Sequence, residues 1–173
     1  MKVFGIAGWS GSGKTTLIEQ LIRYWQTQGL RVSVIKHTHH TLDLDQPGKD
    51  SFRFREAGGH EVLLSSGQRW ALLHENRTQS EIPLTEMLKR LSPCDLVLVE
   101  GYKALPIPKI EVFRAELGKP PLFPNDPQIL ALATPDPVDT LLPVLDLNQA
   151  NCIADFITSN TGLSPKVQNP LAY

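Results

Sequence analysis

The sequence predicts an α/β protein with a mostly parallel central sheet flanked by helices. Residues 3–7 form a short apolar run of the kind that is buried on both faces of a parallel sheet, and a glycine-rich turn follows at once. Apolar residues then recur at helical spacing over residues 17–25, and Gly29 stands where such a helix would end. A second apolar run at residues 32–35 closes a β-α-β unit, whose crossover should be right-handed.

The rest of the chain continues this alternation with one interruption. Residues 61–65 and 69–74 are β-rich runs separated by three residues that include Gly67, which is the spacing of a hairpin. Residues 95–100 give the clearest pattern of a buried strand. The other expected elements are helices at 52–57, 82–91 and 151–159, strands at 109–113, 129–133 and 144–147, a long loop at 37–51, and an extended, proline-rich surface loop at 120–127.

The composition excludes several classes of protein. The chain has 173 residues, 20% of them charged, and a formal net charge of −1, which argues against a disordered tail or a basic nucleic-acid-binding protein. No stretch is apolar for long enough to predict a membrane-spanning helix or a signal peptide, so we expect a cytoplasmic protein without a membrane partner. We expect one domain at residues 1–163, a loosely held tail at 164–173, and two buried free thiols, Cys94 and Cys152.

Residues 8–15 read Gly-Trp-Ser-Gly-Ser-Gly-Lys-Thr and match the phosphate-binding pattern G-x-x-x-x-G-K-[ST] between an expected strand and an expected helix. In such a P-loop, consecutive backbone N–H groups point at phosphate oxygens, which requires dihedral angles that glycine adopts at little cost. The Lys14 ammonium adds a compact positive charge, and the Thr15 hydroxyl is a ligand suited to Mg²⁺. A Rossmann dinucleotide site is disfavoured because the third glycine of its pattern is absent.

A P-loop also requires a carboxylate at the carboxyl end of a neighbouring strand, where it holds magnesium or its water. Glu100 ends the buried run at 95–100 and takes this place, so that Lys14 and Glu100 are the candidate catalytic residues. Asp50 is a second candidate for the metal, and the loop after residue 36 contains two more acids, Asp43 and Asp45. The sequence does not rank these acids.

Lys36 and His37 follow the second strand at the edge of the sheet where ligands bind in open α/β proteins. We therefore count both among the candidate nucleotide-binding residues. His39 and His40 come directly after them, but no fourth ligand is spaced to complete a metal site with these histidines. Contact with phosphate or carboxylate, or plain solvation, is the favoured interpretation of this run.

Five segments together resemble the MobB family, the GTP-binding adapter proteins of molybdopterin guanine dinucleotide biosynthesis. The resemblance extends to about Phe156. It rests on the P-loop and its continuation through Thr16 and Leu17, and on Ile-Lys-His-Thr-His-His at 35–40, Pro-Gly-Lys-Asp-Ser at 47–51, Gln-Arg-Trp-Ala-Leu at 68–72 and Leu-Val-Glu-Gly at 98–101.

This resemblance implies a P-loop NTPase-like fold, binding of GTP with Mg²⁺, weak GTP hydrolysis and a homodimer. The implied partner is the guanylyltransferase that converts molybdopterin to molybdopterin guanine dinucleotide, and molybdopterin or that product is an implied ligand. Because the hairpin at 61–74 interrupts the β-α pattern, we expect it to form the dimer interface. The residues that the resemblance implies for phosphate and magnesium are Gly11, Gly13, Lys14, Thr15 and Thr16, with Glu100 as the acid at the strand end. Ser12, which lies in the same loop, is a further candidate for nucleotide binding.

Guanine selection is not explained by a recognised base-binding motif, since the chain has no Asn-Lys-x-Asp box. We predict that Asp136, just past the strand at 129–133, accepts hydrogen bonds from guanine at the ligand edge of the sheet. The alternative function is a small-molecule kinase, which uses the same P-loop. A kinase needs an arginine-bearing lid over an acceptor pocket, whereas the corresponding segment of this chain predicts a hairpin.

Overall fold

A computed structural model of the protein describes residues 1–38, 42, 44–77, 81–102 and 105–164. The chain forms two compact units. The first, which we call the sheet unit, comprises Met1–His37 and the described part of Arg90–Tyr173. The second, which we call the hairpin unit, comprises the described part of Thr38–Lys89. Each unit is described below in its own right.

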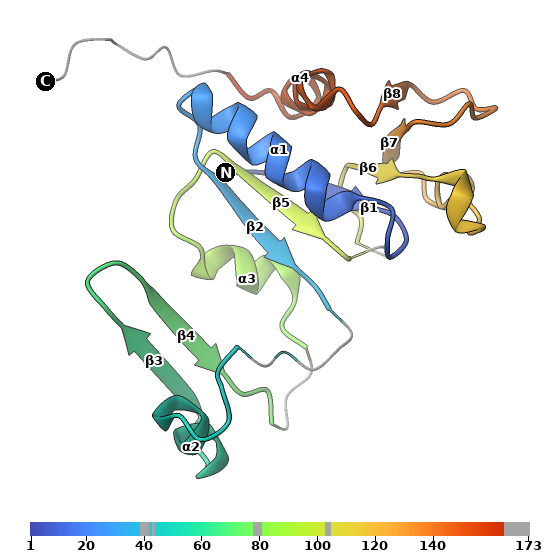
Figure 1. Cartoon of the computed structure of the whole chain (residues 1–173). Helices are drawn as coiled ribbons and strands as arrows, with labels where there is room; N and C mark the ends of the chain where they lie inside the picture. The colour runs from blue at the N-terminus through green and yellow to red at the C-terminus, as the bar shows by residue number, and fades with distance from the viewer. Residues whose placement is uncertain (39–41, 43, 78–80, 103–104, 165–173) are drawn as a thin grey trace, which may run out of the picture. The chain divides into compact units, whose positions relative to one another are not determined.

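The sheet unit is built on a six-stranded sheet in the order β2-β5-β1-β6-β7-β8, and every pair of neighbours is parallel (Figure 1). The predicted parallel sheet is confirmed. Because all strands point the same way, their carboxyl ends share one edge, where loops from distant parts of the chain meet. The strands are β1 (Lys2–Ala7), β2 (Val32–Lys36), β5 (Leu96–Glu100), β6 (Lys109–Val112), β7 (Ile129–Thr134) and β8 (Val144–Asp146).

Two helices, α1 (Lys14–Thr27) and α4 (Ala150–Thr161), pack against each other and against the sheet. The apolar stripe of α1 meets alternate residues of the strands, as strand and helix periodicity require. Trp25 lies fully inside this core, and its indole Nε1 donates to Thr158 Oγ1 of α4 at 3.0 Å, which satisfies its one polar atom. The core includes Phe4, Ile6, Leu17, Leu21, Leu96, Leu98, Ile110, Val112, Ile153 and Ile157.

Two charged side chains of β6 are buried and hold the loop that follows it. Lys109 Nζ donates to the Leu105 carbonyl and to Asp126 Oδ2, both at 2.8 Å. The Glu111 carboxylate accepts hydrogen bonds from the backbone N–H groups of Leu122 and Phe123 at 2.8–3.0 Å. The loop is therefore fixed from inside the sheet by charge-assisted hydrogen bonds.

The segment at 120–127 was expected to be extended throughout, and this expectation is wrong at its centre. Phe123–Asn125 forms a 3₁₀ turn, η2, and a second turn of the same length, η1, covers Ala115–Leu117. Proline fits the first positions of such a turn because its fixed φ is already helical and its missing N–H would have no partner there. The density of prolines thus excludes a long helix but allows a single turn.

The hairpin unit contains α2 (Asp50–Glu56), the antiparallel pair β3 (Glu61–Ser65) and β4 (Trp70–His74), and all of α3 (Leu84–Arg90) except its last residue. The predicted hairpin is confirmed. Its turn is closed by Ser66, whose N–H and hydroxyl both donate to the Arg69 carbonyl. Several large apolar side chains of the two strands are exposed, namely Leu63, Leu64, Trp70 and Leu72.

Arg55 organises the polar interior of the hairpin unit. Its guanidinium donates to both carboxylate oxygens of Asp45, at 2.6 and 3.1 Å, and to Glu75 Oε1 at 3.1 Å. Arg77 from beyond β4 donates to the carbonyls of Arg55 and Gly59, which ties the end of the hairpin to α2. The hydrogen bond from Arg55 is the largest cause that lowers the pKa of the Asp45 carboxyl from its ordinary value.

This pair predicts a specific pH dependence of stability. Because the pKa of Asp45 is lower in the folded chain, the unfolded chain binds more protons in the range just below pH 3.8, and stability should fall as the pH drops. The difference in unfolding free energy between the wild type and Asp45→Asn, from urea titrations between pH 6 and pH 3, should be largest near neutrality and shrink below about pH 4. Asp139→Asn, at an exposed aspartate, is the control and should change the unfolding free energy by no more than about 0.5 kcal/mol at pH 6. A constant difference for Asp45→Asn would contradict the assignment.

Three further expectations concern the chain as a whole. Both cysteines are free, but the expectation that they are buried is wrong: Cys94 is half-buried and Cys152 is exposed on α4. Within the described residues, no helix combines the length and the apolar character needed to cross a membrane. The single domain at 1–163 stays a prediction, and the expected tail at 164–173 lies, from residue 165 onward, outside the described residues.

Candidate functional site

The glycine-rich loop connects β1 to α1, and its backbone conformation depends on its glycines. Gly8, Gly11 and Gly13 all have positive φ. At Gly8, with φ of 140°, an added Cβ would lie 2.4 Å from the Val112 carbonyl oxygen and 2.8 Å from Ser12 Oγ. Only glycine therefore allows the loop to begin this close to the end of β6. Residues 8–13 are thus shaped by β6 as well as by β1.

The loop presents polar groups that suit an anion. The Ser12 side chain is buried, and its Oγ has no hydrogen-bond partner among the described residues. A buried hydroxyl without a partner costs free energy, which a phosphate oxygen at this position would recover. Lys14 Nζ lies across the loop and donates to the Trp9 carbonyl at 2.8 Å. The first turn of α1 contains no acidic residue, so its partial positive charge is not neutralised there.

The Trp9 side chain joins the P-loop to the segment around Pro120. Its indole Nε1 donates to the Pro120 carbonyl at 2.7 Å, and Lys119 Nζ lies 5.9 Å from the centre of its ring. Trp9 thus links the P-loop to the segment at 120–127, whose Leu122 and Phe123 N–H groups donate to the Glu111 carboxylate. Nothing in the local sequence indicates this contact, because Trp9 and Pro120 are 111 positions apart.

Glu100 lies beside the loop, as the sequence predicts. It ends β5 opposite Ile6 of β1 and Lys36 of β2, so the carboxyl ends of the three strands are adjacent. The Glu100 side chain is 9% exposed, and its Oε2 is 3.6 Å from Lys36 Nζ. A buried carboxylate with one cation partner is a suitable ligand for Mg²⁺ or for its coordinated water. Glu100 and Lys36 are therefore brought together next to the P-loop strand.

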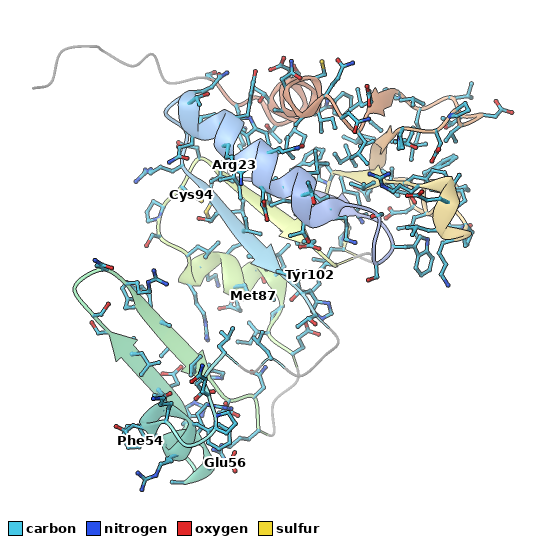
Figure 2. The ribbon with its side chains drawn as sticks, in the orientation of Figure 1. Arg23, Phe54, Glu56, Met87, Cys94 and Tyr102 are labelled. Atoms are coloured by element: carbon cyan, nitrogen blue, oxygen red, sulfur yellow. The ribbon has the colours of Figure 1, made fainter. Side chains whose placement is uncertain are left out.

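A glycine follows Glu100 because the structure leaves no room for a side chain at position 101. The φ of Gly101 is 95°, and an added Cβ would lie 2.6 Å from the His37 carbonyl oxygen. The His37 N–H donates to the Glu100 carbonyl at 2.8 Å, and the His37 ring lies 4.3 Å from the ring of Tyr102, which Figure 2 labels just past the end of β5. His37 is thus held at the ligand edge by its backbone and by its ring.

Arg114 is a site residue that the sequence analysis did not assign. It follows β6, and its Nε donates to the Ser12 carbonyl at 3.1 Å. Its guanidinium also lines a cavity of about 160 Å³ beside the P-loop. Nothing in the local sequence distinguishes Arg114 from a solvated arginine, because the contact joins residues 102 positions apart. The other lining residues are Gly13, Thr16, Leu17, Gln20, Leu147 and Asn148.

Asp136 has a structural contact. Its Oδ2 accepts a hydrogen bond from the Ala115 N–H at 2.8 Å, and its own N–H donates to Thr134 Oγ1 at 3.0 Å. The residue lies past the end of β7, on the edge of the sheet that bears the P-loop. The predicted guanine contact of Asp136 stays a prediction.

The remaining candidates belong to the hairpin unit or lie outside the described residues. Asp50 opens α2 in the hairpin unit, where its exposed carboxylate lies 3.9 Å from Arg53 Nη1. Asp45 belongs to the same unit and is bonded to Arg55. Figure 2 labels Phe54 and Glu56 on α2, the helix that Asp50 begins. His39, His40 and Asp43 lie outside the described residues.

Together, the parallel sheet and the glycine loop between its first strand and first helix define a P-loop NTPase-like α/β protein. Residues 3–135 match the family model of MobB, described as molybdopterin guanine dinucleotide synthesis protein B. The chain belongs to the MobB family, which confirms the resemblance found in the sequence.

Two relatives and one solved structure agree with this membership. The chain is 46% identical over 157 residues to a molybdopterin-guanine dinucleotide biosynthesis adapter protein of Haemophilus influenzae, covering 90% of this chain and 86% of the relative. It is 40% identical over 158 residues to the protein of the same name from Escherichia coli, covering 90% of each chain. A crystal structure of molybdopterin-guanine biosynthesis protein B superposes with a TM-score of 0.72 at 27% identity, covering 91% of this chain and 99% of that one.

Proposed function

We propose that this protein is a GTP-binding adapter of molybdopterin guanine dinucleotide biosynthesis that assists the guanylyltransferase of that reaction. Family membership supports the biosynthetic role. The observation that carries nucleotide binding is the buried Ser12 hydroxyl, which has no partner among the described residues and lies in a loop of positive-φ glycines at the start of α1. This loop supplies backbone N–H groups, one lysine and one orphan hydroxyl to a polyphosphate.

In this proposal, different residues of the site contact the phosphates, the metal and the rest of the nucleotide. Gly11, Ser12, Gly13 and Lys14 would hold the outer phosphates, and the hydroxyls of Thr15 and Thr16, in the first turn of α1, would contact phosphate and Mg²⁺. Thr15 and Glu100 would hold Mg²⁺, which would supply positive charge to neutralise the phosphates. Arg114 and the cavity beside Gly13 extend the site away from the phosphate loop.

Hydrolysis is proposed to be slow. The candidate catalytic residues are Lys14, which stabilises negative charge on the phosphates, and Glu100, which holds the metal or its water. In this proposal neither residue positions the attacking water, and fast P-loop enzymes have a separate group for that step. Binding of nucleotide therefore serves chiefly to order the loops at the ligand edge for a partner. Family membership gives the small-molecule kinase less support than the adapter.

A homodimer formed through the hairpin unit belongs to the same proposal. β3 and β4 are a two-stranded sheet with exposed leucines and Trp70, and an isolated pair of this kind is marginally stable in water. A second copy would cover these side chains and the free strand edges. The guanylyltransferase partner, the molybdopterin ligand and the cytoplasmic location stay predictions.

Calorimetric titration with GTP and with ATP, with and without Mg²⁺, tests the proposal. We expect GTP to bind more tightly with Mg²⁺ than in a chelator, and Glu100→Gln to reduce this gain about tenfold or more while leaving the metal-free affinity close to that of the wild type. Asp50→Asn serves as the matched variant, because Asp50, which lies in the hairpin unit, is the second candidate for the metal. If Asp50→Asn removes the gain and Glu100→Gln does not, the metal assignment moves to Asp50. No GTP binding by the wild type would overturn the proposed function.

A further inference from the structure

Two histidines and one glutamate meet at the open end of the hairpin. His60 precedes β3, Glu61 is its first residue, and His74 is the last residue of β4, directly opposite Glu61 in the antiparallel register. The Glu75 N–H donates to the His60 carbonyl at 3.1 Å, so the backbone pairing continues one step beyond the strands. The three side chains are therefore placed together by the hairpin itself.

Their potential ligand atoms all lie within 4.8 Å of one another. His74 Nδ1 is 2.8 Å from Glu61 Oε1, and the rings of His60 and His74 meet edge to face with their centres 4.8 Å apart. Ligand atoms around a tetrahedral Zn²⁺ are separated by roughly 3.4 Å, from Zn–N and Zn–O distances of about 2.1 Å. The 2.8 Å contact is shorter than this value, and the 4.8 Å limit on the other separations lies above it. His60 and Glu61 are exposed, so small side-chain rotations suffice to bring the ligands to it.

One ring nitrogen of this group lacks a hydrogen-bond partner among the described residues. His74 Nε2 is buried and has no hydrogen-bond partner among the described residues, while Nδ1 of the same ring is bonded to a carboxylate. An imidazole that is oriented by a carboxylate at one nitrogen and is open at the other is the usual arrangement of a metal-binding histidine. A buried nitrogen without a partner is otherwise unfavourable.

We propose that His60, Glu61 and His74 bind a divalent transition-metal ion, Zn²⁺ in the first instance, at the open end of the β3–β4 hairpin. Two imidazoles and one carboxylate suit zinc and disfavour Mg²⁺, which prefers oxygen ligands only. Glu61 either ligates the ion or orients His74 through Nδ1, and water fills the remaining positions. The ion links the start of β3 to the end of β4 and so stabilises the two-stranded sheet.

Equilibrium dialysis of the untagged, chelator-treated full chain against ZnSO₄, followed by metal analysis, tests the site. We expect one Zn²⁺ per chain that excess Mg²⁺ does not displace, and at least a tenfold weaker affinity for both His60→Gln and His74→Gln. His60→Gln changes an exposed side chain and keeps the test valid if His74→Gln fails to fold, which far-UV circular dichroism would show. Zinc should also slow hydrogen exchange of the β3 and β4 amides in the wild type and not in His60→Gln.

Two control variants separate this site from other zinc ligands of the chain. His37→Gln combined with His39→Gln and His40→Gln removes the other histidine run, and Cys94→Ser combined with Cys152→Ser removes both free thiols. Both controls should retain the zinc affinity and the slowed exchange. The proposal is overturned if His60→Gln and His74→Gln bind zinc as the wild type does, or if the affinity is lost only in one of the controls.

Discussion

Replacement of Lys14 by alanine should lower the affinity for GTP by at least tenfold, and by up to about a hundredfold. Lys14 is the one side-chain cation of the loop from Gly8 to Thr15, and a hydrogen bond to a charged group contributes roughly 1.5–3 kcal/mol. The loss should appear with Mg²⁺ and in its absence, because the ammonium acts on the phosphates directly. Calorimetric titration with GTP measures it.

The matched control for this variant is Lys2→Ala. Lys2 begins the strand whose other end leads into the P-loop, so it carries the same charge at the far end of the same element. It should leave GTP binding unchanged. Because Lys14 Nζ also donates to the Trp9 carbonyl, the fold of Lys14→Ala should be confirmed by its thermal unfolding. A folded Lys14→Ala that binds GTP as the wild type does would remove the basis for phosphate binding by this loop.

Replacement of Glu111 by alanine should cost roughly 2–6 kcal/mol of unfolding free energy, at about 1–3 kcal/mol for each of the two N–H donors that lose their acceptor. The Glu111 carboxylate is completely buried and accepts the N–H groups of Leu122 and Phe123. Alanine would leave both donors without this acceptor and would create a cavity in β6. Urea unfolding followed by circular dichroism measures the difference.

Two comparison variants separate the hydrogen bonds of the Glu111 carboxylate from the general effect of replacing a glutamate in this segment. Glu111→Gln keeps one acceptor oxygen and should cost less than alanine, while Glu116→Ala, an exposed glutamate in the same segment, should change stability by no more than about 0.5 kcal/mol. A loss below about 1 kcal/mol for Glu111→Ala would show that the loop is held by other contacts.

Local patterns in the sequence were sufficient to predict the individual elements. The strand, glycine loop and helix at the start of the chain are each encoded within a few residues, by apolar periodicity and by the backbone freedom of glycine. The hairpin was predictable for the same reason, since its register follows from the turn at Ser66 and Gly67. Element ends differ from the predicted ones by one or two residues, where fraying and capping decide the boundary.

Long-range contacts could not be predicted from these patterns. Apolar runs show that strands are buried but do not specify that β5 lies between β1 and β2. Arg114 reaches the carbonyl of Ser12 only because β6 is the other neighbour of β1. The histidines at 60 and 74 were likewise assigned to no site, because an antiparallel register was needed to bring them together.

Because Trp9 belongs to the P-loop and is hydrogen-bonded to Pro120, the loop contains an intrinsic fluorophore. Of the three tryptophans, Trp25 is sealed in the core and Trp70 is exposed in the hairpin, so their emission maxima should lie at opposite ends of the usual range. Trp9 alone belongs to the residues that would meet a polyphosphate. Emission from a Trp70→Phe background can therefore report ligand binding at the loop without any attached dye.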